Sequence, residues 1–196
     1  MTGERMGTAA IVVDVQNDFT EGGSLAVSGG AGVAAAITAH LRSAPYEHVV
    51  ATRDHHIDPG SHFAAAPDYV TTWPAHCVVG TAGVELHPEL DRSLLEAVFD
   101  KGEYQAAYSG FEGHGPGDVG LADWLRSHGV DAVEVMGIAT DHCVAATALD
   151  AAREGFATTV RLDLTAGVAA ETTAAAVERL KAAGVTVLGT PVVAPA

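Results

Sequence analysis

The stretch Ala132-Val-Glu-Val-Met-Gly-Ile-Ala-Thr-Asp-His-Cys143 passes from an apolar, strand-length segment directly into a predicted helix over residues 144–153. Similar short apolar segments recur along the chain, and most lack the in/out alternation of a strand with one solvated face. The predicted strands are 8–15, 48–52, 97–100, 132–137, 158–163 and 185–188. Helical patterns separate them, at 33–41, 121–125, 144–153 and 171–183. This order predicts an α/β fold of three layers, α/β/α, with a six-stranded, mainly parallel sheet.

Length and composition narrow the class of protein. The 196 residues fit a single domain spanning 1–196 with a substantial core. A formal net charge of −15 repels phosphate backbones and anionic lipids, so no nucleic acid or membrane partner is expected. No apolar run approaches the roughly 20 residues that span a bilayer, and the first residues do not resemble a signal peptide. Two cysteines do not make a disulfide framework, which indicates a reducing, cytoplasmic location.

Reactive side chains stand at the ends of four predicted strands. Asp14 lies near the end of the first strand, and Asp54 directly follows the second. Lys101 follows the third, and Cys143 follows the fourth at the predicted helix start. In open α/β sheets the ligand crevice lies outside the carboxyl ends of the strands. The sequence therefore predicts that these four side chains meet at one edge of the sheet.

Cys143 has two interpretations. A lone cysteine at a helix start is commonly a small buried hydrophobic residue. The N–H groups and dipole of a helix N-terminus, however, favour a thiolate, lower the thiol pKa and can hold an oxyanion. Thr140 or Asp141 is expected to cap this helix. Asp14 needs a partner among its apolar neighbours, and pairing with Lys101 would let it take the thiol proton, which favours Cys143 as a nucleophile.

The segment 54–88 shows little periodicity and carries candidate metal ligands. This segment combines a carboxylate and three imidazoles within 23 residues, namely Asp54, His56, His62 and His76. Any one of these histidines alone would be a surface residue of a polar loop. Together they predict one divalent metal ion, and this donor set suits Zn, Fe or Mn. A loop of this length in a compact domain is usually functional.

With these residues in place, the chain resembles the nicotinamidase/pyrazinamidase family of the isochorismatase-like cysteine hydrolase superfamily. The resemblance covers nearly the whole chain, and the first, second and last motifs are highly specific in combination. The matching stretches are Ile11–Phe19, Val50–His62, Trp73–Cys77, Val98–Gly102, Tyr108–Phe111 and Gly137–Cys143.

The resemblance implies a role for each matched residue. It implies a catalytic triad of Asp14, Lys101 and Cys143. The implied metal ligands are Asp54, His56, His62 and His76. A cis peptide between Ile138 and Ala139 would place the Ala139 N–H beside that of Cys143 as an oxyanion hole. The positions that match the family's substrate pocket are Phe19, Leu25, Trp73, Tyr108, Ile138 and His142.

The implied reaction is hydrolysis of nicotinamide, or of pyrazinamide-like amides, to the acid and ammonia through a thioester on Cys143. In the family the metal binds the ring nitrogen and orients this small-molecule substrate. Two alternatives stay open: a related cysteine amidase for another small amide or carbamoyl compound, and a catalytically silent protein that binds metal or nicotinamide. His55 stands where the family usually has Phe or Trp. A monomer or a small homo-oligomer is expected.

Overall fold

The computed structural model describes residues 7–194, so the first residues, on which the signal-peptide argument rests, lie outside the described part. The helices are α1 (Gly30–Ser43), α2 (Leu121–Ser127), α3 (Ala145–Arg153) and α4 (Ala170–Ala182). The strands are β1 (Gly7–Val13), β2 (His48–Asp54), β3 (Ala97–Lys101), β4 (Val130–Ile138), β5 (Ala157–Gly167), β6 (Thr186–Leu188) and β7 (Val192–Val193).

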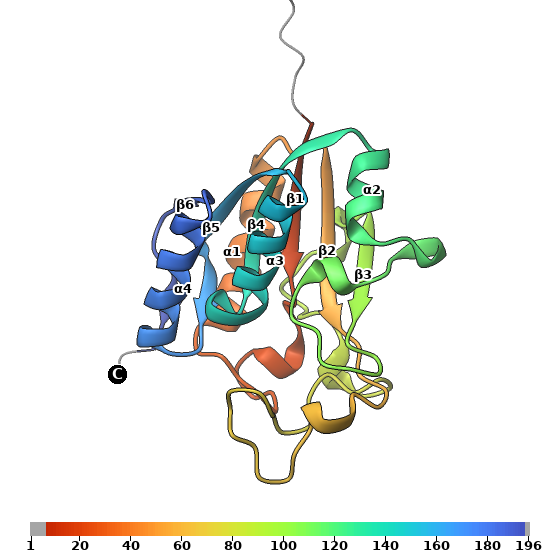
Figure 1. Cartoon of the computed structure of the whole chain (residues 1–196), viewed down its shortest axis with the longest axis vertical. Coiled ribbons are helices and arrows are strands. Elements are labelled where there is room, and N and C mark those ends of the chain that lie inside the picture. Colours follow the sequence, from red (N-terminus) through yellow and green to blue (C-terminus); the bar gives the residue numbers. More distant parts are fainter. Residues whose placement is uncertain (1–6, 195–196) are drawn as a thin grey trace, which may run out of the picture.

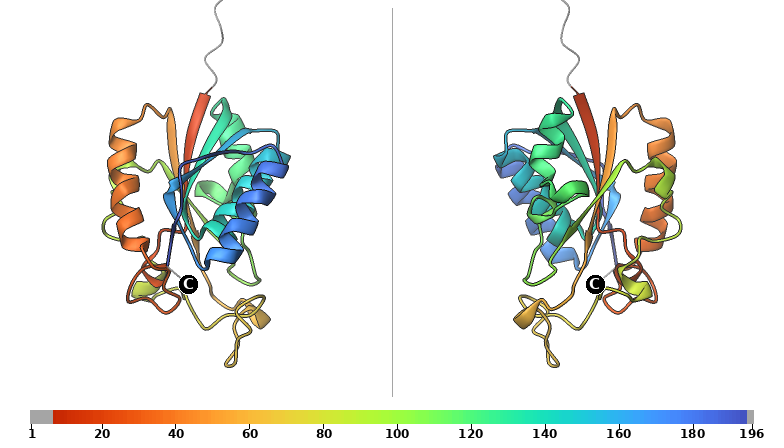
Figure 2. Two further views of the ribbon diagram at one scale, coloured as in Figure 1. Left: turned by 90° about the vertical axis from the view of Figure 1, so that its left-hand side faces the viewer. Right: turned by 90° about the vertical axis from the view of Figure 1, so that its right-hand side faces the viewer.

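One sheet forms the centre of the molecule, in the order β3-β2-β1-β4-β5-β6, and the short β7 pairs with β5 beyond Arg161. The strand pairs are parallel. Helix α1 covers one face, and α2, α3 and α4 cover the other (Figure 1, Figure 2). The predicted three-layer fold with a mainly parallel sheet is confirmed, and β7 is an addition that the sequence pattern did not indicate.

Two apolar cores explain why the strands lack alternation. Along β1, Ile11 and Val13 pack with α2, α3 and α4, whereas Ala10 and Val12 pack with α1 on the opposite face. Both sets of side chains are fully buried, so successive residues of the strand are all apolar. The stripe of Val33, Ile37 and Leu41 seats α1 on the second core, as its spacing predicted.

The long connection between β2 and β3 first runs along the carboxyl ends of the strands, where it forms the lower part of the molecule in Figure 1. It then returns to the amino end of the sheet, where the Glu96 N–H donates to the Val49 carbonyl. It contains short 3₁₀ turns at 60–62, 82–84 and 92–94 and otherwise irregular backbone. Its position places the predicted metal-binding segment against the edge to which the strands deliver their last residues. Among residues 7–194, none of the helices has the length and apolarity to cross a bilayer.

Candidate active site

Four side chains converge where the parallel strands end. Asp14 directly follows β1, Asp54 and Lys101 are the last residues of β2 and β3, and Cys143 lies in a π-helical turn over Thr140–Val144 that follows β4. Oxygen or sulfur atoms of Asp14, Asp54 and Cys143 lie within 4.8 Å of one another, and all three residues are buried. The convergence that the strand ends predicted is therefore present in the fold.

Lys101 is the centre of this group. Its ammonium nitrogen donates a hydrogen bond to Asp54 Oδ1 and another to the carbonyl of Ala107 at 3.3 Å. The same nitrogen lies 2.9 Å from Asp14 Oδ2 and 3.7 Å from Cys143 Sγ. Asp14 Oδ2 takes part in the ion pair but accepts no hydrogen bond of good geometry from any of residues 7–194, although it is fully buried. One cation thus faces two carboxylates and the thiol.

Burial and charge act in opposite directions on these groups. Burial raises the pKa of Asp14 above its usual value, against the opposing charge of Lys101. Burial also opposes ionisation of Asp54, but the charge of Lys101, with His56 and His76 close by, holds the pKa of Asp54 well below its usual value. For Lys101 itself, the two carboxylates outweigh burial and raise the pKa of its ammonium. Lys101 is therefore charged, and Asp14 is the more basic carboxylate.

Cys143 departs from the expectation that a helix start lowers the thiol pKa. Burial raises the pKa of Cys143 well above its usual value, and the charge of Lys101 only partly offsets this effect. The thiol is therefore neutral near pH 7 in the free protein and needs a base to remove its proton. Asp14, whose pKa is raised in the same site, is placed to act as that base.

The predicted helix cap is also corrected. Neither Thr140 nor Asp141 caps the turn that carries Cys143. The Asp141 carboxylate instead accepts hydrogen bonds from the N–H of Val168 at 2.9 Å and from the Thr172 hydroxyl at 2.5 Å. These partners lie at the start of α4, so Asp141 links the Cys143 turn to the next helix. Thr140 turns its hydroxyl to Thr165.

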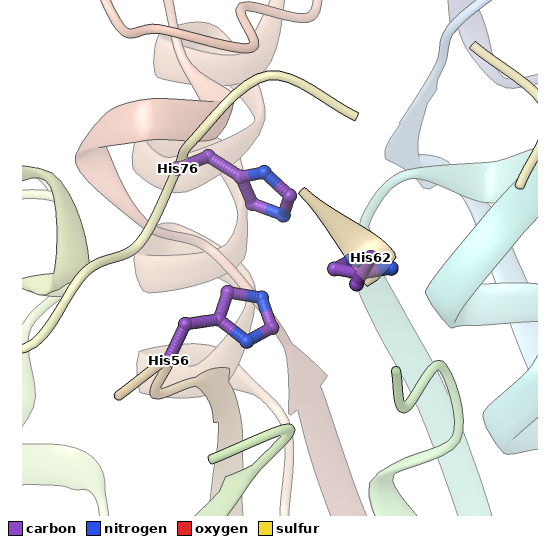
Figure 3. A group of neighbouring side chains, drawn as sticks. All are labelled: His56, His62 and His76. Atoms are coloured by element: carbon purple, nitrogen blue, oxygen red, sulfur yellow. The ribbon is translucent and has the colours of Figure 1, made fainter. Parts of the chain in front are cut away.

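Three imidazoles form a group beside Asp54. His56, His62 and His76 each present a ring nitrogen within 4.8 Å of the other two, and their rings surround a common space in Figure 3. Asp54 Oδ2 lies 3.6 Å from His56 Nε2 and 3.7 Å from His76 Nε2. The four predicted ligands therefore lie together, although they come from separated points of the segment.

The hydrogen bonds of the three imidazole rings are those expected at a metal site. His56 Nδ1 pairs with the carbonyl of Gly102 at 2.6 Å, and His76 Nδ1 pairs with the carbonyl of Pro74 at 2.7 Å. Such bonds direct the Nε2 lone pair of each ring toward a cation. His56 Nε2 and His62 Nδ1 are buried without a hydrogen-bond partner among the described residues. Buried lone pairs of this kind are costly unless a ligand meets them.

A cavity of about 280 Å³ opens onto both groups. Cys143, Asp54, His62 and His76 line it, whereas Asp14, Lys101 and His56 lie behind its wall. The predicted pocket residues that line it are Phe19, Leu25, Trp73, Tyr108, Ile138 and His142. Ala139 also reaches this cavity, and its peptide bond to Ile138 is cis.

Aromatic rings make one wall of the cavity. The indole N–H of Trp73 donates to the Tyr108 hydroxyl at 3.0 Å. The ring of His142 lies edge to face with Trp73 at 5.2 Å between centroids and stacks on Tyr108 at 6.4 Å. A wall of this kind suits a flat, weakly polar ring.

Sequence reasoning missed part of the lining. Tyr69 and Val168 line the cavity and are 60% and 47% exposed, respectively, so they lie at its mouth. Val168 follows β5, and the rule that crevices lie at carboxyl ends of strands could have found it. Tyr69 lies in an irregular loop, where no periodic signal exists. His55 does not line the cavity, and its Nδ1 pairs with Glu103 at 3.0 Å.

Comparison with known proteins identifies the class. The sequence profile of the isochorismatase domain matches residues 8–191. The chain therefore belongs to the isochorismatase domain family. It is 61% identical over 178 residues to the nicotinamidase/pyrazinamidase of Mycobacterium tuberculosis, covering 90% of this chain and 96% of that protein.

Two solved structures share the fold. One is an L. infantum protein in complex with nicotinate, with a TM-score of 0.83, 37% identity, and coverage of 96% of this chain and 95% of that chain. The other is a pyrazinamidase of Pyrococcus horikoshii in complex with zinc, with a TM-score of 0.78, 34% identity, and coverage of 93% and 98%.

Proposed function

We propose that the chain hydrolyses nicotinamide to nicotinate and ammonia, with Cys143 as the nucleophile. The observation that carries the proposal is a single cavity lined by Cys143, by aromatic rings and by two histidines of the imidazole group. The similar proteins named above support the substrate, because one is a nicotinamidase/pyrazinamidase and another is in complex with nicotinate.

The first half of the reaction forms a thioester. Asp14 removes the proton from the Cys143 thiol, and the sulfur attacks the carboxamide carbon. The N–H groups of Ala139 and Cys143 are the proposed donors to the oxyanion that develops on the carbonyl oxygen. The tetrahedral adduct then collapses, the C–N bond breaks, and the amine takes the proton held by Asp14 and leaves as ammonia.

The second half returns the enzyme to its starting state. Asp14 removes a proton from water, and the hydroxide attacks the thioester carbon. Collapse breaks the C–S bond and the sulfur regains its proton from Asp14, and the carboxylic acid product gives its proton to bulk water and leaves as nicotinate. In both halves Lys101 stays protonated, and its position between Asp14 Oδ2 and Cys143 Sγ lets it follow the negative charge as the proton moves.

The proposed metal ligands are Asp54, His56, His62 and His76, within the segment 54–88. A divalent cation held there supplies a coordination position for the nitrogen of a pyridine or pyrazine ring, and Zn, Fe and Mn suit this donor set. Trp73, Tyr108 and Phe19 would hold the ring, with Leu25, Ile138 and His142 completing the pocket. In this proposal the metal and the aromatic side chains bind the ring of the substrate, and Cys143 attacks its carboxamide. Both parts of the substrate therefore need to lie in one cavity.

Ammonia release on protein of defined metal content tests the function. We expect turnover of nicotinamide and pyrazinamide by metal-loaded protein, with aliphatic amides such as propionamide turned over far more slowly. Faster turnover of aliphatic or carbamoyl compounds would replace the proposal with the related amidase. Binding of nicotinamide without ammonia release from any amide would show a silent binding protein.

A further inference from the structure

Thr52 contacts the proposed base twice. It lies fully buried in β2 and pairs in register with Val13, the residue before Asp14. The Thr52 carbonyl accepts the N–H of Asp14 at 3.1 Å. Its hydroxyl donates to Asp14 Oδ1 at 2.7 Å. One residue therefore fixes both the backbone and the carboxylate of Asp14.

These contacts leave the two carboxylate oxygens of Asp14 in different states. Oδ1 accepts the single proton of the Thr52 hydroxyl, so it stays an acceptor. Oδ2 faces Lys101 and, within the part of the chain that the structure describes, accepts no hydrogen bond of good geometry, although it is buried. Oδ2 is thus the less engaged of the two oxygens, because it lies beside Lys101 but accepts no hydrogen bond from a described residue.

The neighbourhood of Thr52 fixes which way its side chain points. The Thr52 methyl lies against Gly110, where an added Cβ would come within 2.5 Å of that methyl. Because Gly110 has no side chain, the methyl occupies that space and the hydroxyl is directed at Asp14. A β-branched side chain in a strand keeps a restricted χ1, which maintains this arrangement.

We propose that Thr52 is a positioning residue that holds the Asp14 carboxylate so that the proton from Cys143 arrives at Oδ2. The role rests on the proposed function, because it acts through the proposed base. Thr52 itself does not line the cavity, and its hydroxyl donates to Asp14 rather than to Cys143. It therefore affects the chemical step rather than substrate binding.

Two substitutions separate the hydroxyl from the shape of the side chain. Thr52→Val removes the hydroxyl and keeps the volume and the backbone carbonyl, whereas Thr52→Ser keeps the hydroxyl. We expect Thr52→Val to lower kcat for nicotinamide by about ten- to a hundredfold, with KM within about twofold, because a hydrogen bond to a charged group is lost. Thr52→Ser should stay within about threefold of the wild type.

A second measurement needs no amide substrate. The rate of Cys143 alkylation by iodoacetamide reports removal of the thiol proton and should fall in Thr52→Val and recover in Thr52→Ser. Thr158→Val is the matched control, because Thr158 is a buried strand threonine whose hydroxyl donates to the Phe156 carbonyl far from the site. That control should leave both rates within about twofold. Should Thr52→Val not fold, Thr52→Ala removes the same hydroxyl and is interpreted in the same way.

Wild-type rates in the hydroxyl-free variant, or a Thr52→Ser protein as slow as Thr52→Val, would overturn the positioning role. Failure of the proposed function has a different signature: the wild type releases no ammonia from nicotinamide, while the alkylation rates still decide the role of Thr52.

Discussion

At the scale of single residues, the main feature is one buried cation between two buried carboxylates. Lys101 carries a charge that water cannot screen, and Asp14 and Asp54 are equally enclosed. Removing one member of such a group leaves uncompensated charge in the interior, which costs more than the intact group contributes. The same arrangement gives Asp14 and Asp54 opposite pKa shifts, although both are aspartates at strand ends.

Lys101→Met should expose this dependence. We expect the free energy of unfolding at pH 8 to fall by about 3–5 kcal/mol in metal-free protein, because two buried carboxylates lose their cation. Lys181→Met is the matched control, since Lys181 is exposed on α4 and pairs with the exposed Glu178. Its loss should stay within about 0.5 kcal/mol. Denaturant titration measures both, and equal losses in the two variants would contradict the buried network.

The pH dependence of Lys101→Met gives an independent check. In the wild type, Lys101 holds the pKa of Asp54 below its unfolded value, so that contribution is present above about pH 4 and lost as pH falls through the folded pKa. Without Lys101, burial and mutual repulsion raise both carboxylate pKa values above the unfolded ones. The folded variant then binds a proton and gains stability from pH 8 toward pH 5. A variant that instead parallels the wild type over this window would contradict the assigned charges.

Sequence patterns located these residues but not their charge states. Asp14, Lys101 and Cys143 follow apolar runs, so a rule about strand ends suffices to bring them together. The raised pKa of Cys143 depends on burial by distant segments, and no local sequence pattern predicts that burial. Thr52 was missed for a related reason: it lies inside a strand and matters only because β1 and β2 pair in this register.

At the scale of elements, Asp141 connects the π-helical turn to α4. Its carboxylate accepts from Val168, Ala169 and Thr172, and Val168 lines the cavity. Asp141 thereby serves as a cap for a helix that begins 29 residues later in the chain, where α4 itself has no side-chain cap. The connection ties the wall of the cavity to the turn that carries Cys143.

Asp141→Ala should loosen this connection. We expect a loss of about 1–2 kcal/mol in the free energy of unfolding, typical of a lost helix cap, and a higher KM for nicotinamide because Val168 is no longer held. Asp131→Ala, on the exposed start of β4, is the control. Thermal unfolding and steady-state kinetics measure the two effects. An unchanged KM and an unchanged free energy of unfolding would contradict the role of Asp141 in holding α4 and Val168.

The elements themselves were largely predictable from the chain. The predicted strands and helices are present because long apolar runs and helical stripes are strong signals. Boundaries shifted where polar residues continue a strand, as when β2 and β3 extend to Asp54 and Lys101. The two-residue β7 leaves no periodic pattern, and the expected cap at Asp141 failed because a side chain can serve another helix in space.

At the scale of the whole molecule, the parallel strand ends and the long β2–β3 connection together line one cavity. The two parts bring different kinds of side chain to it. The strand ends supply Cys143, the proposed nucleophile, and its buried partners, and the connection supplies imidazoles and Trp73. The sequence indicated these histidines as metal ligands. The sequence did not indicate that His62 and His76 line the cavity and that His56 does not, because this depends on how the connection folds.

Metal removal should be visible in stability. Chelated protein given back Zn²⁺, Mn²⁺ or Fe²⁺ should unfold at higher temperature, because a ligand at about 100 times its Kd adds about 2.7 kcal/mol to the folded state. His56→Ala should abolish the metal-induced shift, and His128→Ala, an exposed histidine stacked on Trp124, should retain it. A stripped protein whose unfolding temperature ignores all three ions would contradict a metal site at these residues.

The most direct test of Cys143 as the nucleophile is ammonia release from nicotinamide by Cys143→Ala protein, with calorimetric binding of nicotinamide as the check on folding. We expect kcat to fall by a factor of the order of 10⁶ while binding remains measurable, because the variant keeps the cavity and loses only the proposed nucleophile. Ammonia release near the wild-type rate would contradict the assignment of Cys143.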